Sequence, residues 1–128
     1  ADGSKNVEFL GRVSNDKLLD LYDSCKAYIF PALEDFGIVV AEAMAHGTPV
    51  LSYGKGGALE IVKDGETGFF FNEQSPMAVA RTVEYFERKS RENPLSEKNI
   101  RSRALQFAKK RFMIEIRKAI KNGLERLS

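Results

Sequence analysis

Two carboxylates, Glu34 and Glu42, are separated by seven residues in the most informative stretch of the chain. Gly37 lies between them and lets the backbone turn closely, just where Ile38 begins the apolar run of an expected helix. The free amide groups at a helix start favour a bound anion, phosphate above all. Carboxylates beside them suit a ligand that also carries hydroxyl groups, because ionised carboxylates accept hydrogen bonds from hydroxyls. Phosphate together with several hydroxyls describes a nucleotide sugar.

The elements around these residues predict a parallel sheet. The apolar run 27–30 predicts a strand that ends at Pro31, because proline cannot donate to a strand ladder. Residues 38–46 predict a helix that Gly47 ends, and 48–53 hold a second strand. This alternation is typical of an α/β fold, a Rossmann-like parallel sheet with flanking helices. In such sheets ligands bind at the carboxyl ends of the strands.

Further elements extend this pattern on both sides. The short alternating run 6–11 predicts a strand, and 16–24 predict a helix with Ser14 or Asn15 as its N-cap. Three phenylalanines at 69–71 predict a buried strand, followed by a helix with Ser75 as N-cap and Pro76 in its first turn. The loops at 11–14, 31–37 and 53–57 are therefore expected to line one crevice.

The stretch from 30 to 50 resembles the signature of the retaining, GT-B-type glycosyltransferases of family 4. That signature has two glutamates with seven residues between them, Phe-Gly-Ile or Phe-Gly-Leu within that gap, and Ala-x-Gly-x-Pro-Val after the second glutamate. This chain has every element: Glu34, Phe36, Gly37, Ile38, Glu42, Ala43, Ala45, Gly47, Pro49 and Val50. The resemblance covers about residues 6–80. It implies the donor-binding half of a GT-B fold, which moves a hexose from a nucleoside diphosphate to an acceptor hydroxyl with retention.

The resemblance also implies a role for each matching residue. Glu34, the catalytic candidate, is expected to orient the sugar donor through the sugar hydroxyls. Glu42 is expected to accept hydrogen bonds from the ribose. The backbone amides of Phe36, Gly37 and Ile38 are expected to hold the diphosphate. The scheme requires no metal and no cofactor, since helix amides and basic residues can stabilise the charge of the leaving group.

Two further segments complete the expected site. The family counterparts of Arg12 and Val13 lie beside the nucleobase, although a solvated surface arginine remains an alternative for Arg12. Gly56 and Gly57 permit a close approach of the backbone to a ligand. The string 53–60 around them looks most like bacterial and archaeal mannosyltransferases, which implies GDP-mannose as donor, with a UDP-sugar as the rival.

Other function classes are less favoured. Sugar-nucleotide epimerases share the two-domain fold but lack the Phe-Gly-x-x-x-x-Glu-Ala string. A non-catalytic nucleotide-binding or interaction domain would not need both Glu34 and Glu42. One Cys and one His exclude a zinc site built only from these residue types. Nucleic-acid binding is not expected, because it would rest only on a basic C-terminal segment without a reading motif.

Charge is divided unevenly along the chain. Residues 1–80 carry six Lys/Arg and 12 Asp/Glu, whereas residues 81–128 carry 14 Lys/Arg and six Asp/Glu. Residues 95–128 predict a C-terminal helical segment, bent near Phe112, whose apolar stripe packs on the sheet and whose basic face is solvated. The alternative for this segment is a peripheral contact with anionic lipid at the inner face of a membrane.

The 128 residues suffice for a single domain. The chain opens with Ala-Asp-Gly and is too short for both Rossmann-like domains of the family, so we expect a partial domain of a longer protein. The acceptor-binding domain, and an upstream Arg and Lys that neutralise the diphosphate in the family, are expected outside it. The chain alone should therefore be inactive. The lone Cys25 fits a reducing compartment, and we expect a cytoplasmic protein.

Overall fold

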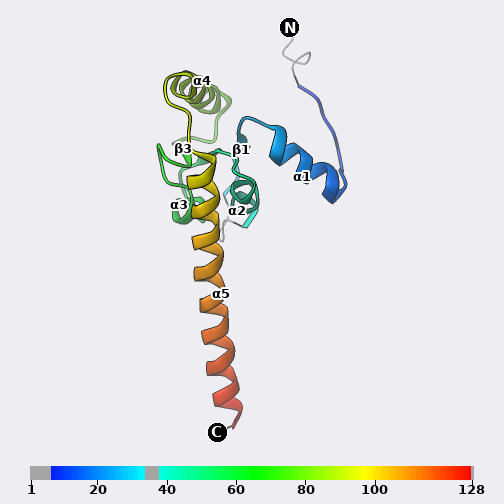
Figure 1. Cartoon of the computed structure of the whole chain (residues 1–128), viewed down its shortest axis with the longest axis vertical. Helices are drawn as coiled ribbons and strands as arrows, with labels where there is room; N and C mark the ends of the chain where they lie inside the picture. Colours follow the sequence, from blue (N-terminus) through cyan, green and yellow to red (C-terminus); the bar gives the residue numbers. More distant parts are fainter. Residues whose placement is uncertain (1–6, 34–37, 128) are drawn as a thin grey trace.

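The structure, a computed structural model, describes residues 7–33 and 38–127. Three strands and five helices follow one another in these residues as α1 (Asn15–Ser24), β1 (Tyr28–Phe30), α2 (Ile38–Ala45), β2 (Val50–Tyr53), α3 (Ala58–Ile61), β3 (Gly68–Phe71), α4 (Pro76–Glu92) and α5 (Glu97–Leu127). Figure 1 shows an α/β body from which α1 extends to one side and the far half of α5 projects as a single rod. The predicted α/β fold class is confirmed.

The three strands form a parallel sheet in the order β1-β2-β3. Val50 pairs with Tyr28 on one side and with Gly68 on the other. A side chain at Gly68 would collide with the carbonyl group of Val50, which explains glycine at the start of β3. Because the strands are parallel, their carboxyl ends at Phe30, Tyr53 and Phe71 share one edge of the sheet.

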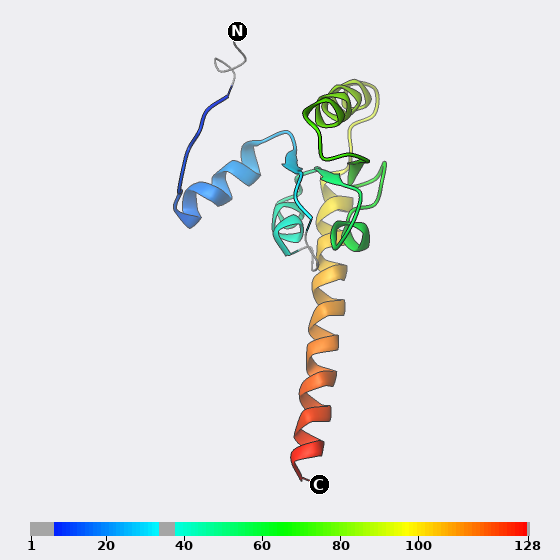
Figure 2. The same cartoon turned by 180° about the vertical axis from the view of Figure 1, so that it is seen from behind.

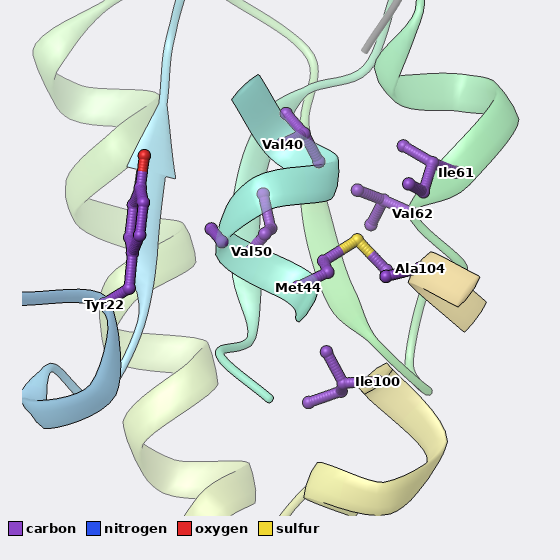
Figure 3. Packing of buried hydrophobic residues seen from close by; sticks show 9 residues of the cluster. Tyr22, Val40, Met44, Val50, Ile61, Val62, Ile100 and Ala104 are labelled. Carbon is purple, nitrogen blue, oxygen red and sulfur yellow. The ribbon is translucent and has the colours of Figure 1, made fainter. Parts of the chain in front are cut away.

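Helices cover both faces of this sheet. Val50 of β2 is buried against α2, α3 and α5, whereas its neighbour Leu51 packs with Phe69 and with Phe86 of α4. This division follows from the alternation of side chains along a strand. Figure 3 shows Met44 of α2, which is 0% exposed, between the sheet and α5. The arrangement is a three-layer α/β/α sandwich around the sheet.

The helix starts follow the sequence closely. The Ser14 hydroxyl accepts a hydrogen bond from the amide of Lys17 at 3.2 Å, and the Ser75 hydroxyl accepts one from the amide of Ala78 at 3.2 Å. Pro76 occupies the first turn of α4. Each hydroxyl satisfies an amide that has no partner inside its helix. The predicted N-caps of α1 and α4 are confirmed.

The strand predicted at residues 6–11 is wrong for the described part, because residues 7–11 form no strand. Phe9 is 92% exposed, and Figures 1 and 2 show this segment running outside the body. Alternating apolar residues favour a strand only where a neighbouring strand supplies hydrogen-bond partners. The described sheet offers residues 7–11 no such partner, so the loop at 11–14 does not follow a strand end.

The C-terminal segment also differs from its prediction. The bend expected near Phe112 is absent, and α5 is one continuous helix from Glu97 to Leu127. The segment has no proline after residue 94 to break it. Ile100 and Ala104 are buried, but Phe112 is 63% exposed, so only the first part of α5 packs on the body. In the described part of the chain, no helix combines the length and apolar character needed to cross a membrane.

Candidate functional site

The start of α2 lies at the carboxyl edge of the sheet. α2 begins at Ile38 and leads to β2, which lies parallel to β1. A helix that connects parallel strands runs back across the sheet, so its first turn lies at the carboxyl edge, where its free amides favour an anion. Glu34, Phe36 and Gly37 lie outside the described residues. Their predicted roles therefore stay predictions, as does the role of the Ile38 amide.

A glycine turn follows β2 at the same edge. The amide of Gly54 donates to the carbonyl of Phe71 at 2.9 Å, which ties the turn to the end of β3. Gly56 has a φ of 75°, in the left-handed region that favours glycine, and Gly57 is the N-cap of α3. The Lys55 ammonium lies 5.9 Å from the centre of the Tyr53 ring. The turn therefore brings exposed backbone and a cation to the edge where α2 begins.

Arg103 of α5 binds the C-terminal end of α3. Its guanidinium donates to the carbonyls of Ile61 and Glu60, each at 2.9 Å. Carbonyls at a helix end have no partner within the helix, so a charged donor stabilises them. The sequence suggested only a solvated basic face for α5. Helical periodicity could have predicted this contact, because Arg103 lies three residues after the buried Ile100 and so faces the body.

Glu42 is an exposed residue of α2, next to the buried Ala43 and Met44. It lines a groove of about 600 Å³ between α2 and α5. The groove is apolar except for three charged residues, and its lining consists of Ala41, Glu42, Ala45, Arg101, Ala104, Leu105, Phe107, Ala108 and Arg111. The sequence pattern did not predict that Glu42 shares a groove with two arginines of α5.

The negative charge of Glu42 affects the pKa of the nearby Tyr22. Burial, then the negative charge of Glu42, then Cys25, raise the pKa of Tyr22 above its ordinary value. The Tyr22 carbonyl accepts a hydrogen bond from the Thr48 hydroxyl at 2.6 Å, which fixes the end of α1 against the turn before β2. The carboxylate of Glu42 therefore contributes to the raised pKa of Tyr22 and also lines the groove.

His46 lies at the opposite edge of the sheet. It follows α2, and its Nδ1 lies 2.7 Å from a carboxylate oxygen of Asp23. The pair lines a cavity of about 350 Å³ together with Cys25. His46 therefore lies away from the edge of the sheet where α2 begins. Cys25 is exposed, although partial burial of its thiol raises the pKa of that group.

Arg12 and Val13 lie in the segment before α1. Arg12 is exposed and Val13 is half-buried. In Figures 1 and 2 this segment runs outside the body, and the described residues do not bring it beside the glycine turn. Their contact with a nucleobase stays a prediction. Among the described residues, no three His, Cys, Asp or Glu side chains are grouped so that they could hold a metal ion.

A match to a family model identifies the family of this chain. The model for glycosyl transferases group 1 matches residues 1–107. The chain belongs to the glycosyl transferases group 1 family. An uncharacterised glycosyltransferase of Methanocaldococcus jannaschii is 42% identical over 79 residues, which make up 61% of this chain and 20% of that protein. A D-inositol 3-phosphate glycosyltransferase of Streptomyces scabiei is 38% identical over 78 residues, 60% of this chain and 18% of that protein.

A solved structure supports the same relationship. Sucrose-phosphate synthase from Thermosynechococcus elongatus superposes with a TM-score of 0.76 at 27% identity, over 93% of this chain and 31% of that one. The match confirms the predicted GT-B fold type. The chain spans about a fifth of the length of the two curated relatives, so the activity of a whole protein is a matter for proposal.

Proposed function

We propose that this chain binds the nucleotide-sugar donor of a retaining hexosyltransferase. The observation that carries the proposal is the meeting of two anion-favouring backbone features at one edge of the sheet. These are the start of α2 at Ile38 and the glycine turn with Gly56 in the left-handed region. Both bring backbone to the edge where ligands of parallel sheets bind, and the first amides of a helix have no partner inside that helix. Membership of the group 1 family supports a diphosphate joined to a sugar as the ligand.

The two glutamates and the backbone amides have separate roles in the proposed chemistry. Glu34 orients the sugar through its hydroxyls, and Glu42 accepts hydrogen bonds from the ribose. The amides of Phe36, Gly37 and Ile38 stabilise the departing diphosphate, because negative charge develops there in the transition state. The exposed carboxylate of Glu42 is free of the core packing that buries its neighbours in α2, which supports a role in binding.

Mannose carried by GDP is the proposed sugar donor. The support is the likeness of the string 53–60 to mannosyltransferases, and Arg12 and Val13 are the proposed contacts of the base. A UDP-sugar is the alternative. The names of the relatives, an inositol phosphate glycosyltransferase and a sucrose-phosphate synthase, do not point to a single sugar.

The rest of the proposed enzyme lies in other parts of a longer protein. The matched relatives are about five times longer than the matched segment, which leaves room for an acceptor-binding domain. Without that domain the chain holds a sugar donor but has no acceptor to receive the hexose. We therefore expect donor binding without turnover by this chain.

Calorimetry with variants tests the proposal. GDP, UDP and their sugar conjugates are titrated into the chain and into Glu42→Ala. Loss of a charge-assisted hydrogen bond should weaken binding about tenfold. The control is Glu84→Ala, an exposed glutamate on the opposite side of the sheet, which should bind like the parent chain. Equal loss in both variants, or no nucleotide preference over inorganic phosphate, would contradict the proposal.

A further inference from the structure

The glycine turn at residues 54–57 is held by hydrogen bonds at both of its ends. At its start, the amide of Gly54 donates to the carbonyl of Phe71 at 2.9 Å, which ties the turn to β3. At its end the turn runs into α3, where the amide of Glu60 donates to the carbonyl of Gly57 at 3.1 Å. The first anchor is the sheet itself. The second is only as firm as the contacts that hold α3.

α3 is too short to keep its place by its own hydrogen bonds. It consists of the four residues Ala58–Ile61, and a helix of one turn is unstable alone because its first bonds fix many dihedral angles. Burial of Ala58 and Ile61 holds one side of α3 against the body. Apolar packing is non-directional, however, so polar contacts are needed to fix the helix along its axis.

Arg103 supplies two such contacts at the C-terminal end of α3. Its Nε donates to the carbonyl of Ile61, and its Nη2 donates to the carbonyl of Glu60, each at 2.9 Å. A planar guanidinium presents both donors in a fixed geometry, which a lysine ammonium does not. Glu60 thus bonds in two directions, through its amide to the turn and through its carbonyl to Arg103. A continuous path of hydrogen bonds joins the guanidinium to the glycine turn.

The part of α5 that carries Arg103 also packs on α2. Ile100 and Ala104 are 0% and 4% exposed, and they belong to one buried cluster with Met44 of α2. Figure 3 shows Ala104 beside Met44 and Val62, the C-cap of α3. Close-packed interiors yield little to displacement. The first turns of α5 therefore connect α2 to the glycine turn, by packing on one side and through Arg103 on the other.

We propose that Arg103 is a positioning residue for the nucleotide-sugar donor. It holds the glycine turn at the distance from the start of α2 at which the two features together contact the diphosphate. It acts through the backbone of α3 and does not touch the ligand. The inference rests on the proposed function, because the turn and the start of α2 are the two backbone features that the function uses.

Calorimetry of the whole chain and of Arg103→Gln tests the inference. Each is titrated with GDP, UDP and the corresponding monophosphates. The affinity for the better diphosphate should fall about tenfold, because two phosphates need both backbone features. The affinity for its monophosphate should fall less than about threefold, because one phosphate can use α2 alone. Arg103→Lys keeps the charge and one donor, so it should recover part of the ratio between the two affinities.

Two control variants separate positioning from a general loss of stability. Phe86→Leu removes packing on the opposite face of the sheet, where Phe86 is 6% exposed, and should lower stability without changing the ratio of the two affinities. Arg88→Gln removes the same charge from α4, where the guanidinium lies 5.5 Å from the centre of the Tyr85 ring, and should leave the ratio unchanged. Urea denaturation measures the stability of each variant.

Amide hydrogen exchange without ligand follows the turn directly. Exchange at residues 56–61 should be about tenfold faster in Arg103→Gln than in the parent chain, and exchange in β2 should be unchanged. If Arg103→Gln does not fold, the ratio in Arg103→Lys decides, with an expected fall of about threefold.

The outcomes distinguish this inference from the proposed function. Absence of nucleotide binding by the parent chain would overturn both. Binding by the parent chain, with the same ratio of affinities in the Arg103 variants, would overturn the inference alone. An equal change of the ratio in Phe86→Leu would also overturn the inference, because stability would then explain the effect.

Discussion

At the scale of single residues, Gly56 shows how backbone geometry links sequence to the site. Its φ of 75° places it in a region that residues with a side chain rarely adopt. The next residue, Gly57, is buried and is the N-cap of α3. The glycine turn therefore owes its shape to the left-handed backbone of Gly56, and that shape brings the exposed Gly56 to the edge where α2 begins.

Gly56→Ala should destabilise the chain by about 1–2 kcal/mol, because alanine is strained in the left-handed region. It should also weaken nucleotide binding if the turn contacts the ligand. Gly123→Ala is the control, since Gly123 lies in α5 with nothing within 4 Å of an added Cβ. That change should stabilise by about 0.5–1 kcal/mol. Urea denaturation measures both, and equal effects of the two substitutions would contradict the role of Gly56.

Tyr22 gives the chain a dependence on alkaline pH. Burial and the charge of Glu42 raise its pKa above 10.0, so the folded state holds the phenolic proton more tightly than the unfolded state. The stability that this provides is complete below pH 10.0 and is lost as the pH rises through the folded pKa. Between about pH 10 and 11 the parent chain should lose more stability than Tyr22→Phe. Urea denaturation across this range checks the difference, and parallel losses would refute it.

At the scale of elements, the first turns of α5 hold the layers together. Ile100 and Ala104 pack against Met44 of α2, and Arg103 caps the end of α3. Figure 3 shows this junction with Val50 and Val62 beside it. The near end of α5 is therefore a core element, although its far half projects from the body.

Ile100→Ala should cost about 2–5 kcal/mol, because it leaves a cavity between α5 and the sheet. The matched control is Ile120→Ala in the same helix, where the side chain is 58% exposed. That change should cost less than about 0.5 kcal/mol. Chemical denaturation compares the two. Similar losses would mean that the far half of α5 also packs on the body in solution.

At the scale of the whole molecule, local signals predicted much of the fold. The apolar runs and Gly47 correctly placed β1, α2 and β2, and the serine caps placed the starts of α1 and α4. These features depend on residues close in sequence. Family membership and fold type then followed from the motif between 30 and 50.

The errors concern partners that are distant in sequence. Residues 7–11 have the alternation of a strand but no neighbour to pair with, and Phe9 stays exposed. The apolar stripe of α5 predicted burial along its length, although periodicity does not say which turns meet the sheet. The contact of Arg103 with α3 and the groove beside Glu42 arise only when α5 folds back on α2 and α3.

The central proposal is that a nucleoside diphosphate sugar binds at the carboxyl edge of the sheet. An amide NMR titration of the chain with GDP-mannose and a UDP-sugar tests it most directly. The proposal predicts saturable shifts confined to residues 12–14, 35–39 and 54–60, larger for one nucleotide and strongly reduced in Glu42→Ala. Shifts confined to the cavity beside His46, or none at millimolar ligand in a chain extended upstream, would contradict it.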